Sequence, residues 1–513
     1  MAPEDLTMSR APVTPLPRLA RIADGLVAAL VLLSAFIAAT GGGRLRYAGL
    51  QLSLTDPVRP LAVAAIIVVL RHWLVRTPTI VERFRRWLKA PPGQVPTDSK
   101  LLTVGFLAGL VLRLLMLAQM GTTDMLEYRD WAQRAWESGL PQTYHGIYFP
   151  LQYQIFMVCD WLAATLAVNW VPVFKFANLL FDACAFVLVA HLLRRQGSRP
   201  AYALLYWLHP WFLSVFSLGY IDFQFMFFVL LCVACLRGER TKDYLLAGVP
   251  LGAAFLMKPQ AQVLMVVSFA YGMFRLARAR DPRPLAILAF PIVLFLAYEA
   301  YFASVLVAER GARAAALLPE SYLGVVNVMP ALTAQMPNLW YPIAYLLKQP
   351  GDQIYAVSDQ LRPLLGVPLK YAAAVVVLGL VIFHVSRVAR RSSATVAERF
   401  LSMFGFATVI IPFLMTSAHE NHLFLGSVFL VLFLAKSMSP AFRWAAHALL
   451  AIQFLNIYGL YGNYPVWVGE LMRGTYSQRL ALVYALVSVP CFVWVLRELG
   501  RKPNTSSSSG CVP

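Results

Sequence analysis

Apolar runs long enough to cross a membrane alternate with short polar segments along most of the 513-residue chain. A membrane-spanning helix needs about 20 mostly apolar residues. Fourteen runs fit, several of them short, at about 22–40, 58–75, 101–120, 172–193, 201–218, 221–236, 244–257, 261–274, 285–303, 368–385, 400–417, 423–435, 441–460 and 480–496. The pattern therefore predicts an all-α polytopic membrane protein.

One further apolar stretch, 150–168, is also long enough to cross, and counting it would reverse the orientation of every later span. Cytoplasmic loops carry an excess of Lys and Arg. Asp160 in the middle of the stretch and Pro150 at its start favour a juxtamembrane or re-entrant helix. If the stretch does not cross, every compact basic loop faces the cytoplasm, namely 71–100, 194–199, 237–242, 275–283, 387–399 and 436–443.

The resulting map places both termini in the cytoplasm. The first run follows a polar head of about twenty residues, which favours a signal anchor over a cleaved signal peptide. The segments are an N-terminal tail with two spans and a basic loop (1–100), a transmembrane module with a long outer loop at 121–170 (101–303), a second long outer loop (304–365), the C-terminal spans (366–498) and a disordered tail (499–513). We expect juxtamembrane helices in the long outer loops.

The composition excludes a soluble enzyme, because 59% of the residues are apolar and only 13% are charged. The net charge of +19 would suggest nucleic acid in a polar chain, but here the basic residues lie between apolar runs. The positive-inside rule accounts for them, so we expect membrane lipids and no nucleic acid as partners. Six scattered cysteines do not make a disulfide framework.

Costly polar side chains in a membrane protein mark functional sites, and here they collect at the predicted outer face. After the third span, Asp124, Glu127 and Tyr128 have the spacing of one helix face. The Asp124 carboxylate at the membrane rim suits a general base acting on a substrate hydroxyl. Thr122 and Thr123 suit helix capping, and capping with solvated charge is the alternative reading of the whole cluster.

Two tight outer turns carry further charges. Asp222 and Gln224 follow the turn between the fifth and sixth predicted spans, where a simple helix cap is the alternative. Lys258 lies at the outer end of a span, against the positive-inside trend. An outer lysine of this kind is typical of a point charge that binds phosphate.

The segment from Ser417 to His422 places polar residues between two hydrophobic spans, including His419 and Glu420. Hydrogen bonding to a polar or phosphorylated ligand fits this segment better than zinc, because zinc proteases place two histidines four residues apart on one helix. In the second outer loop, Asn338 and Trp340 offer an amide beside an aromatic ring, suited either to a membrane-interface belt or to stacking on a sugar.

In order and spacing these motifs resemble the GT-C superfamily of integral-membrane glycosyltransferases. They are most similar to the dolichyl-phosphate-glucose-dependent glucosyltransferases and their bacterial relatives. The matching elements are Asp124 with Arg129 and Trp131, Glu127 one place displaced, Tyr148-Phe149-Pro150-Leu151, Asp222-Phe223-Gln224-Phe225, Lys258-Pro259-Gln260, Asn338-Leu339-Trp340 and His419-Glu420. Asp222, Met226 and Asn421 stand where the family has His, Asn and Lys. The resemblance therefore does not imply that the donor sugar is glucose.

The resemblance implies a GT-C fold that transfers one sugar, with inversion, from a polyprenyl-phosphate donor to a glycan or lipid-linked acceptor. Asp124 would be the catalytic base. The donor phosphate and sugar would be held by Lys258, His419, Glu420, His422, Asp222 and Gln224, with Glu127, Arg129, Trp131, Asn338 and Trp340 in support. No cofactor or metal is expected, since the first loop lacks an Asp-x-Asp pair.

Two other function classes stay open. A transporter or lipid flippase would place ionisable residues near the midplane, where Arg113 and Asp182 are candidates that can also form a structural ion pair. A glycan ligase or polymerase would share the outer loops. The Ala- and Arg-rich composition favours a bacterial inner membrane with a periplasmic site, or the endoplasmic reticulum in a eukaryote.

Overall fold

In the computed structural model the chain forms two compact units, Met1–Gln94 and Val95–Pro513. The structure describes residues 18–40, 43–47, 50–54, 58–75, 99–311, 316–324, 329–362, 366–391, 394–436, 439–461 and 478–500. The predicted tail at 499–513 and the outer loop between the last two predicted spans therefore lie largely outside the described residues.

The first unit consists of two helices and a hairpin. Helices α1 (Arg18–Thr40) and α2 (Val58–Leu74) pack together, and between them strands β1 (Gly43–Tyr47) and β2 (Leu50–Leu54) pair antiparallel, with Gly43 opposite Leu54. Arg71 Nε on α2 donates to Asp24 Oδ1 on α1 at 2.9 Å. The hairpin is an addition to the helical fold that the apolar pattern does not predict.

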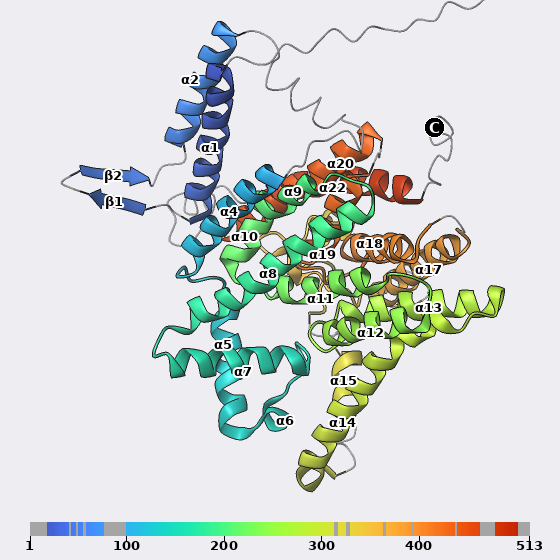
Figure 1. The fold of residues 1–513 in the computed structure, drawn as a ribbon. Coiled ribbons are helices and arrows are strands. Elements are labelled where there is room, and N and C mark those ends of the chain that lie inside the picture. Colours follow the sequence, from blue (N-terminus) through green and yellow to red (C-terminus); the bar gives the residue numbers. More distant parts are fainter. Residues whose placement is uncertain are drawn as a thin grey trace, which may run out of the picture. The chain divides into compact units, whose positions relative to one another are not determined.

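The second unit is helical (Figure 1). Its elements are α4 (Ser99–Met116), α5 (Asp124–Ser138), α6 (Leu140–Thr143), α7 (Pro150–Thr165), α8 (Trp170–Arg195), η1 (Pro200–Tyr202), α9 (Ala203–Leu208), α10 (Pro210–Leu218), α11 (Asp222–Cys235), α12 (Thr241–Phe255), α13 (Ala261–Ala279), η2 (Arg283–Leu288), α14 (Ala289–Arg310), α15 (Leu317–Gly324), α16 (Trp340–Leu347), η5 (Ile354–Ala356), α17 (Leu369–Ala389), α18 (Val396–Leu414), α19 (Phe424–Leu434), α20 (Pro440–Tyr461) and α22 (Gln478–Gly500).

Among the described residues, five helical segments are long and apolar enough to cross a membrane: Trp170–Arg195, Arg283–Glu309, Leu369–Ala389, Val396–Leu414 and Gln478–Gly500. They make the chain a helical, multi-pass membrane protein. Other predicted spans are shorter in the structure; the 14 residues of α11 extend only about 21 Å, less than the thickness of a bilayer core.

The predicted span at 201–218 is broken. Helices α9 and α10 meet at an angle of 49°, and the pair counts as a sixth candidate span only if the bend is included. Pro210 causes the break, because it lacks an amide hydrogen and cannot continue α9. His209 takes an extended backbone conformation there, and its Nδ1 accepts the amide hydrogen of Trp211 at 3.2 Å, which caps α10.

The stretch from residue 117 to 169 leaves the helix bundle and returns to it at the same end. Lys175, in the second turn of α8, donates to the carbonyl of Gln119 just beyond α4, at 2.6 Å. Helices α5, α6 and α7 therefore lie at this end, and α5 packs on α7. Helix α7, which covers most of the disputed apolar stretch, is not among the candidate spans.

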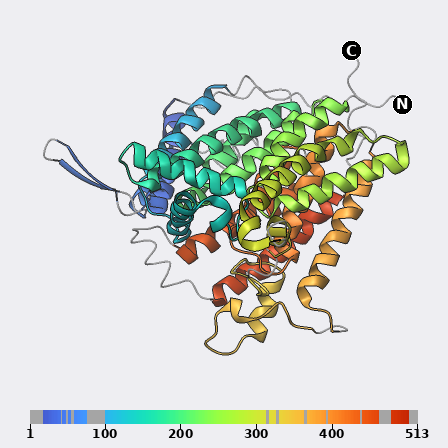
Figure 2. The same cartoon turned by 90° about the horizontal axis from the view of Figure 1, so that it is seen from below.

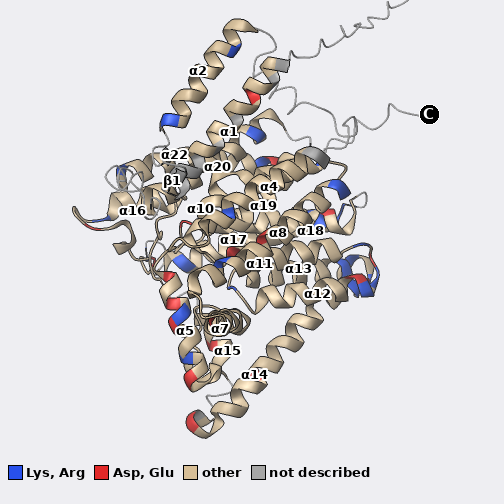
Figure 3. Cartoon of the chain, turned by 60° about the vertical axis from the view of Figure 1, so that its left-hand side comes forward, with Lys and Arg blue, Asp and Glu red and all other residues tan. Residues whose placement is uncertain are grey.

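Helices α11, α13 and α18 run between two polar ends of the second unit. Figures 2 and 3 show this bundle from other sides, and Figure 3 shows charged residues gathered near the ends of α12 and α13 and along α5. At one end, Asp222 at the start of α11 contacts Lys258 just before α13 and Asn421 just before α19. At the other end, Glu239 contacts Arg275 on α13 and Arg399 on α18.

Candidate functional site

The polar end that holds Asp222 brings together four separated segments of the chain. The first is the start of α5, which lies directly on the turn between α10 and α11. Thr122 N donates to Leu218 O at 2.9 Å. A side chain on Gly121 would come within 2.1 Å of that carbonyl, and Gly219 has a left-handed φ of +78° against Met125. Both glycines are thus required for this close approach.

Helix α5 is held in place by buried aromatic rings. Tyr128 stacks on Phe156 of α7, with ring centroids 4.7 Å apart, and Trp131 stacks on Tyr153 at 5.7 Å. These rings belong to one core cluster shared by α5, α7 and α8. Trp131 therefore acts through packing. With Tyr128 buried below it, Asp124 is fixed in the first turn of α5 at a half-buried position.

A buried ion pair lies at the centre of the site. Lys258 Nζ is 2.6 Å from Asp222 Oδ1, and the two side chains are only 5% and 6% exposed. Asn421 Nδ2 donates to the other carboxylate oxygen, Asp222 Oδ2, at 3.1 Å. The alternative interpretation of Asp222 as a simple helix cap is therefore not what the structure shows, because its side chain makes no cap hydrogen bond to α11. Instead it joins three segments, and it supplies the anionic partner that Lys258 needs.

Beside this pair, Glu420 organises a second hydrogen-bonded group. Its Oε1 atom accepts from the hydroxyls of Tyr220 at 2.6 Å and Tyr461 at 2.7 Å. Its Oε2 atom is 3.9 Å from His419 Nδ1. Glu420 is 3% exposed, whereas the His419 side chain is 40% exposed. The carboxylate is thus fixed from the α10–α11 turn and from the end of α20, while the imidazole beside it faces outward.

His422 is held as a neutral imidazole. Its Nδ1 accepts the backbone N–H of His419 at 3.2 Å, which requires an unprotonated nitrogen. Burial lowers the pKa of His422 well below its ordinary value, and nearby His419 and Lys258 lower it further. Its Nε2–H is then a neutral donor. No group of three or more potential metal ligands is found among the residues that the structure describes.

The loop that carries these histidines is anchored by Asn338 and Trp340. Asn338 Nδ2 donates to Pro412 O at 3.0 Å and Trp340 Nε1 donates to Leu414 O at 2.7 Å, while the intervening amide of Leu339 donates to Phe413 O. These carbonyls end α18 and have no partner within the helix. Asn338 and Trp340 thus fix where the loop begins.

Asp124 is electrostatically coupled to the rest of the site. Burial raises the pKa of the Asp124 carboxyl, the neighbouring charge of Glu420 and that of Glu127 raise it further, and His419 opposes them. Tyr128 and Tyr148 join their hydroxyls at 3.2 Å, and burial raises the pKa of both phenols. The pKa of the Asp124 carboxyl therefore lies above the ordinary range for aspartate, which suits a group that accepts a proton.

Below the ion pair, buried amides form a chain. Gln152 Nε2 donates to Gln224 Oε1 at 3.0 Å, Gln224 Nε2 donates to Asn178 Oδ1 at 2.7 Å, and Asn178 Nδ2 donates to Tyr220 O at 3.1 Å. All three amides are fully buried. Gln224 is therefore a support for the turn that carries Tyr220 and Asp222, joining it to α7 and α8.

Most of the predicted site residues meet, and two kinds of exception stand out. Arg129 is exposed and pairs with Asp160 of α7 at 3.7 Å, so its described partner lies outside the ion-pair cluster. Thr123 makes no side-chain cap at the start of α5, contrary to expectation.

The predicted pair of Arg113 and Asp182 forms, with Arg113 Nε 2.5 Å from Asp182 Oδ2.

Sequence patterns alone do not predict the part played by several side chains of the site, among them Gln152, Asn178, Tyr220 and Tyr461. Asn178 was detectable, because Lys175, Asn178 and Asp182 follow each other at three and four residues on an otherwise apolar helix. Polar groups at that spacing share one face and need buried partners. Tyr461 had no local signal, since its role depends on a contact with Glu420 across 41 residues.

Comparison with known proteins does not assign the chain to a family: no family model matches the sequence, and no curated protein is significantly similar to it. The class that the fold defines is a helical, multi-pass membrane protein. Four segments form its polar site at one end of the bundle, and any functional proposal depends on the residues of this site.

Proposed function

We propose that the protein is an inverting glycosyltransferase of the GT-C type, which moves one sugar from a polyprenyl-phosphate donor to an acceptor hydroxyl on a lipid-linked or envelope glycan. The proposal includes about fourteen membrane spans, cytoplasmic termini and a site on the non-cytoplasmic face, the periplasmic face of a bacterial inner membrane. One observation carries it: Asp124, Asp222, Lys258 and Glu420 come from four segments and meet at one end of the bundle.

The chemistry of such a transfer fits these groups. The acceptor oxygen attacks C1 of the donor sugar from the side opposite the phosphate, its proton passes to the Asp124 carboxylate, and the C1–O bond to the polyprenyl phosphate breaks. The leaving phosphate gains charge, which fixed donors stabilise. Lys258 and the neutral Nε2–H of His422 are such donors. For Lys258 to bind the phosphate, its ammonium must share or exchange its contact with Asp222.

The buried Arg113–Asp182 pair favours an enzyme over a transporter. Asp182 accepts from Arg113 and from the hydroxyl of Tyr206, and the Arg113 guanidinium stacks 3.6 Å from the centre of the Trp207 ring. A transported ion or proton would need a carboxylate that exchanges partners. Asp182 has its oxygens occupied from two helices, which fits a structural ion pair better than a relay.

Replacing Asp124 tests the proposal. In vesicles supplied with a polyprenyl-phosphate sugar and envelope glycolipids, Asp124→Asn should lower transfer by about 10²- to 10⁴-fold, because the amide cannot accept the proton. The matched control is Asp130→Asn on the same helix, where the acid is 52% exposed and paired with Arg134. This control should retain transfer.

The pH profile gives a second readout of Asp124. Its raised pKa means that the ionised base is lost as pH falls through a value above the ordinary one for aspartate, so wild-type transfer should decline there. Retained transfer in Asp124→Asn would overturn the assigned role of the carboxylate. If the wild-type protein transfers no sugar while glycolipids accumulate on one membrane face without it, the function belongs to a flippase.

A further inference from the structure

A buried lysine joins the two segments that support the acids of the candidate site. Lys175 lies in the second turn of α8 and is fully buried. Its Nζ atom donates to three backbone carbonyls: Ser217 O at 2.5 Å, Gln119 O at 2.6 Å and Met116 O at 3.3 Å. An ammonium group has three hydrogens to donate, so these contacts use all of them.

The three carbonyls belong to the ends of two different helices. Met116 is the last residue of α4 and Gln119 follows it, while Ser217 lies in the last turn of α10. The last four carbonyls of a helix lack partners within it, and the negative end of the helix dipole attracts a cation. Lys175 thus caps α4 and α10 together, a use of a buried cation that needs no carboxylate.

Both caps lie a few residues before an acid of the site. Asp124 follows Gln119 by five residues, and Asp222 follows Ser217 by five residues. The two segments also touch directly, since Ser217 Oγ donates to Gln119 Oε1 at 3.1 Å and Thr122 N donates to Leu218 O at 2.9 Å. Lys175 is the cation at the base of this junction.

We propose that Lys175 is a positioning residue, which sets the placement of Asp124 relative to Asp222 by binding the ends of α4 and α10. It touches neither acid. The inference about transfer rests on the proposed function, whereas the inference about local structure does not. Hydrogen exchange of the two capped segments therefore tests the positioning role even if the protein transfers no sugar.

The experiment compares Lys175→Met with Arg195→Met in the full chain, purified in detergent and reconstituted. Arg195 is a matched control, because it lies at the far end of α8 and also donates to the carbonyls at a helix end, Ala234 O at 3.0 Å and Leu236 O at 2.9 Å. Lys175→Met should speed amide exchange about 10- to 100-fold in segments 117–124 and 217–222, as expected for lost charged hydrogen bonds. Arg195→Met should speed exchange only near residues 234–237.

Transfer supplies the second readout. In Lys175→Met, kcat should fall about tenfold or more while the KM for the donor stays within about threefold, because Asp222 keeps its own contacts with Lys258 and Asn421. Lys175→Arg, which keeps the cation, should restore most of kcat. If Lys175→Met does not fold, Lys175→Gln keeps two donors and should show the same local pattern more weakly.

Two results would overturn the positioning role. One is exchange that stays unchanged in both segments or rises equally throughout the chain. The other is a loss of kcat in Arg195→Met as large as in Lys175→Met. Local exchange changes without any wild-type transfer would retain the positioning role and reject the proposed function.

Discussion

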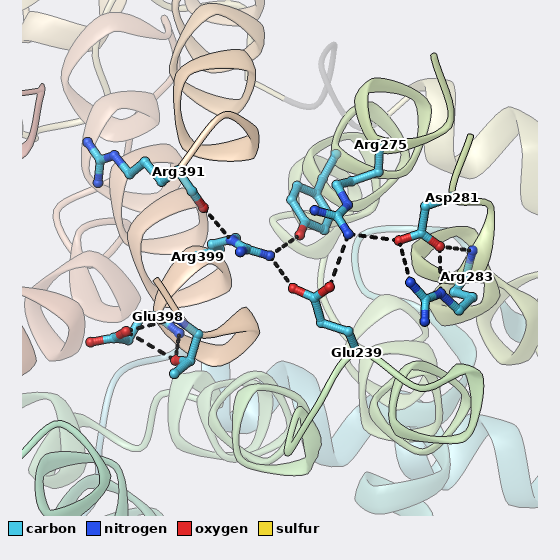
Figure 4. A network of polar contacts seen from close by, with 9 residues as sticks. Glu239, Arg275, Asp281, Arg283, Arg391, Glu398 and Arg399 are labelled. Atoms are coloured by element: carbon cyan, nitrogen blue, oxygen red, sulfur yellow. Dashed lines mark hydrogen bonds and ion pairs between the residues drawn. The ribbon is translucent and has the colours of Figure 1, made fainter. Parts of the chain in front are cut away.

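The two polar ends of the second unit use charge in opposite ways. At the end that holds the candidate site, acids predominate, and Lys258 is the cation paired with them in the described contacts. At the other end, arginines predominate: Glu239 and Asp281 are each bound by two of them (Figure 4). Helix α13 connects the two ends, with Ala261 and Arg275 about 21 Å apart along its axis.

The arginine-rich end is a closed network. Arg399 Nη1 is 2.5 Å from Glu239 Oε1, and Arg275 Nη2 bridges Glu239 Oε2 at 3.0 Å and Asp281 Oδ2 at 2.9 Å. Arg283 Nε completes the network on Asp281 Oδ1 at 2.7 Å. Each carboxylate oxygen faces a guanidinium, and the contacts link three loops that the positive-inside rule assigns to the cytoplasm, 237–242, 275–283 and 387–399.

The acid-rich end is organised but not closed. Both oxygens of Asp222 and Oε1 of Glu420 are bound by neighbours, whereas the structure shows no side-chain hydrogen bond to the half-buried Asp124 carboxylate among the described contacts. His419 also faces outward. A network in which every carboxylate oxygen is bound by an arginine stabilises a fold, while a raised-pKa acid beside fixed donors is typical of a reactive site. The comparison therefore sets a structural end against the end that we propose to be functional.

Labelling from the two sides of the membrane would break or confirm the assignment of the ends. In a cysteine-free background, Val168→Cys and Arg194→Cys introduce exposed thiols just before α8 and near its end. An impermeant maleimide should label position 168 in intact cells, and position 194 only after permeabilisation. The effect is all or none, because α8 is a candidate span.

The two positions control for each other. Labelling of both from outside would mean that α8 does not cross, and labelling of position 194 alone would reverse the proposed orientation.

Breaking the central ion pair should give the next largest effect. Lys258→Met leaves the Asp222 carboxylate buried with only Asn421 beside it, so the free energy of unfolding should fall by about 3–5 kcal/mol. Asp222→Asn combined with Lys258→Met removes both charges and should recover most of that loss. Sugar transfer should stay abolished in both variants, measured per folded protein after thermal unfolding in detergent.

This pair of variants separates stability from function. Recovery of transfer together with stability in the double variant would show that Lys258 has a structural role only.

The sequence predicts the helical class and much of the site, because both depend on local patterns. Apolar runs locate most helices within a few residues; the run at 172–193 became α8, Trp170–Arg195. The local pattern does not predict an element correctly where tertiary contacts determine its boundaries or its type. The span at 285–303 became η2 and the longer helix α14, which continues to Arg310, and nothing in the first unit's sequence reading indicated the β1–β2 hairpin.

At the site, unusual placement of charge predicts which residues take part but not whom they contact. Lys258 was notable for its position against the positive-inside trend, yet its partner Asp222 lies 36 residues away. Asn338 and Trp340 are predicted to support the site or to lie in an interface belt, but their type does not predict that they bind the end of α18 across 74 residues. Such long-range partners depend on the packing of helices, which a single sequence does not encode in its spacing.

The smallest predicted effect lies in the arginine-rich network. Arg399→Met removes a side chain that is 4% exposed and that binds Glu239, Tyr271 and the carbonyl of Arg391. We expect the free energy of unfolding to fall by about 1.5–3 kcal/mol, less than for Lys258→Met, because Glu239 is 36% exposed and keeps Arg275 as a partner. Transfer per folded protein should change by less than about twofold, since the network lies at the far end of α13 and α18.

The control for this variant is Lys436→Met, which removes an exposed pair. The Lys436 and Glu398 side chains are 38% and 31% exposed and 2.9 Å apart, so solvent screening should limit the loss to about 0–1 kcal/mol. Equal losses in the two variants would contradict a buried, cooperative network. A loss of transfer in Arg399→Met beyond its loss of folded protein would show that the two ends are coupled through α18, and the division into a structural and a functional end would fail.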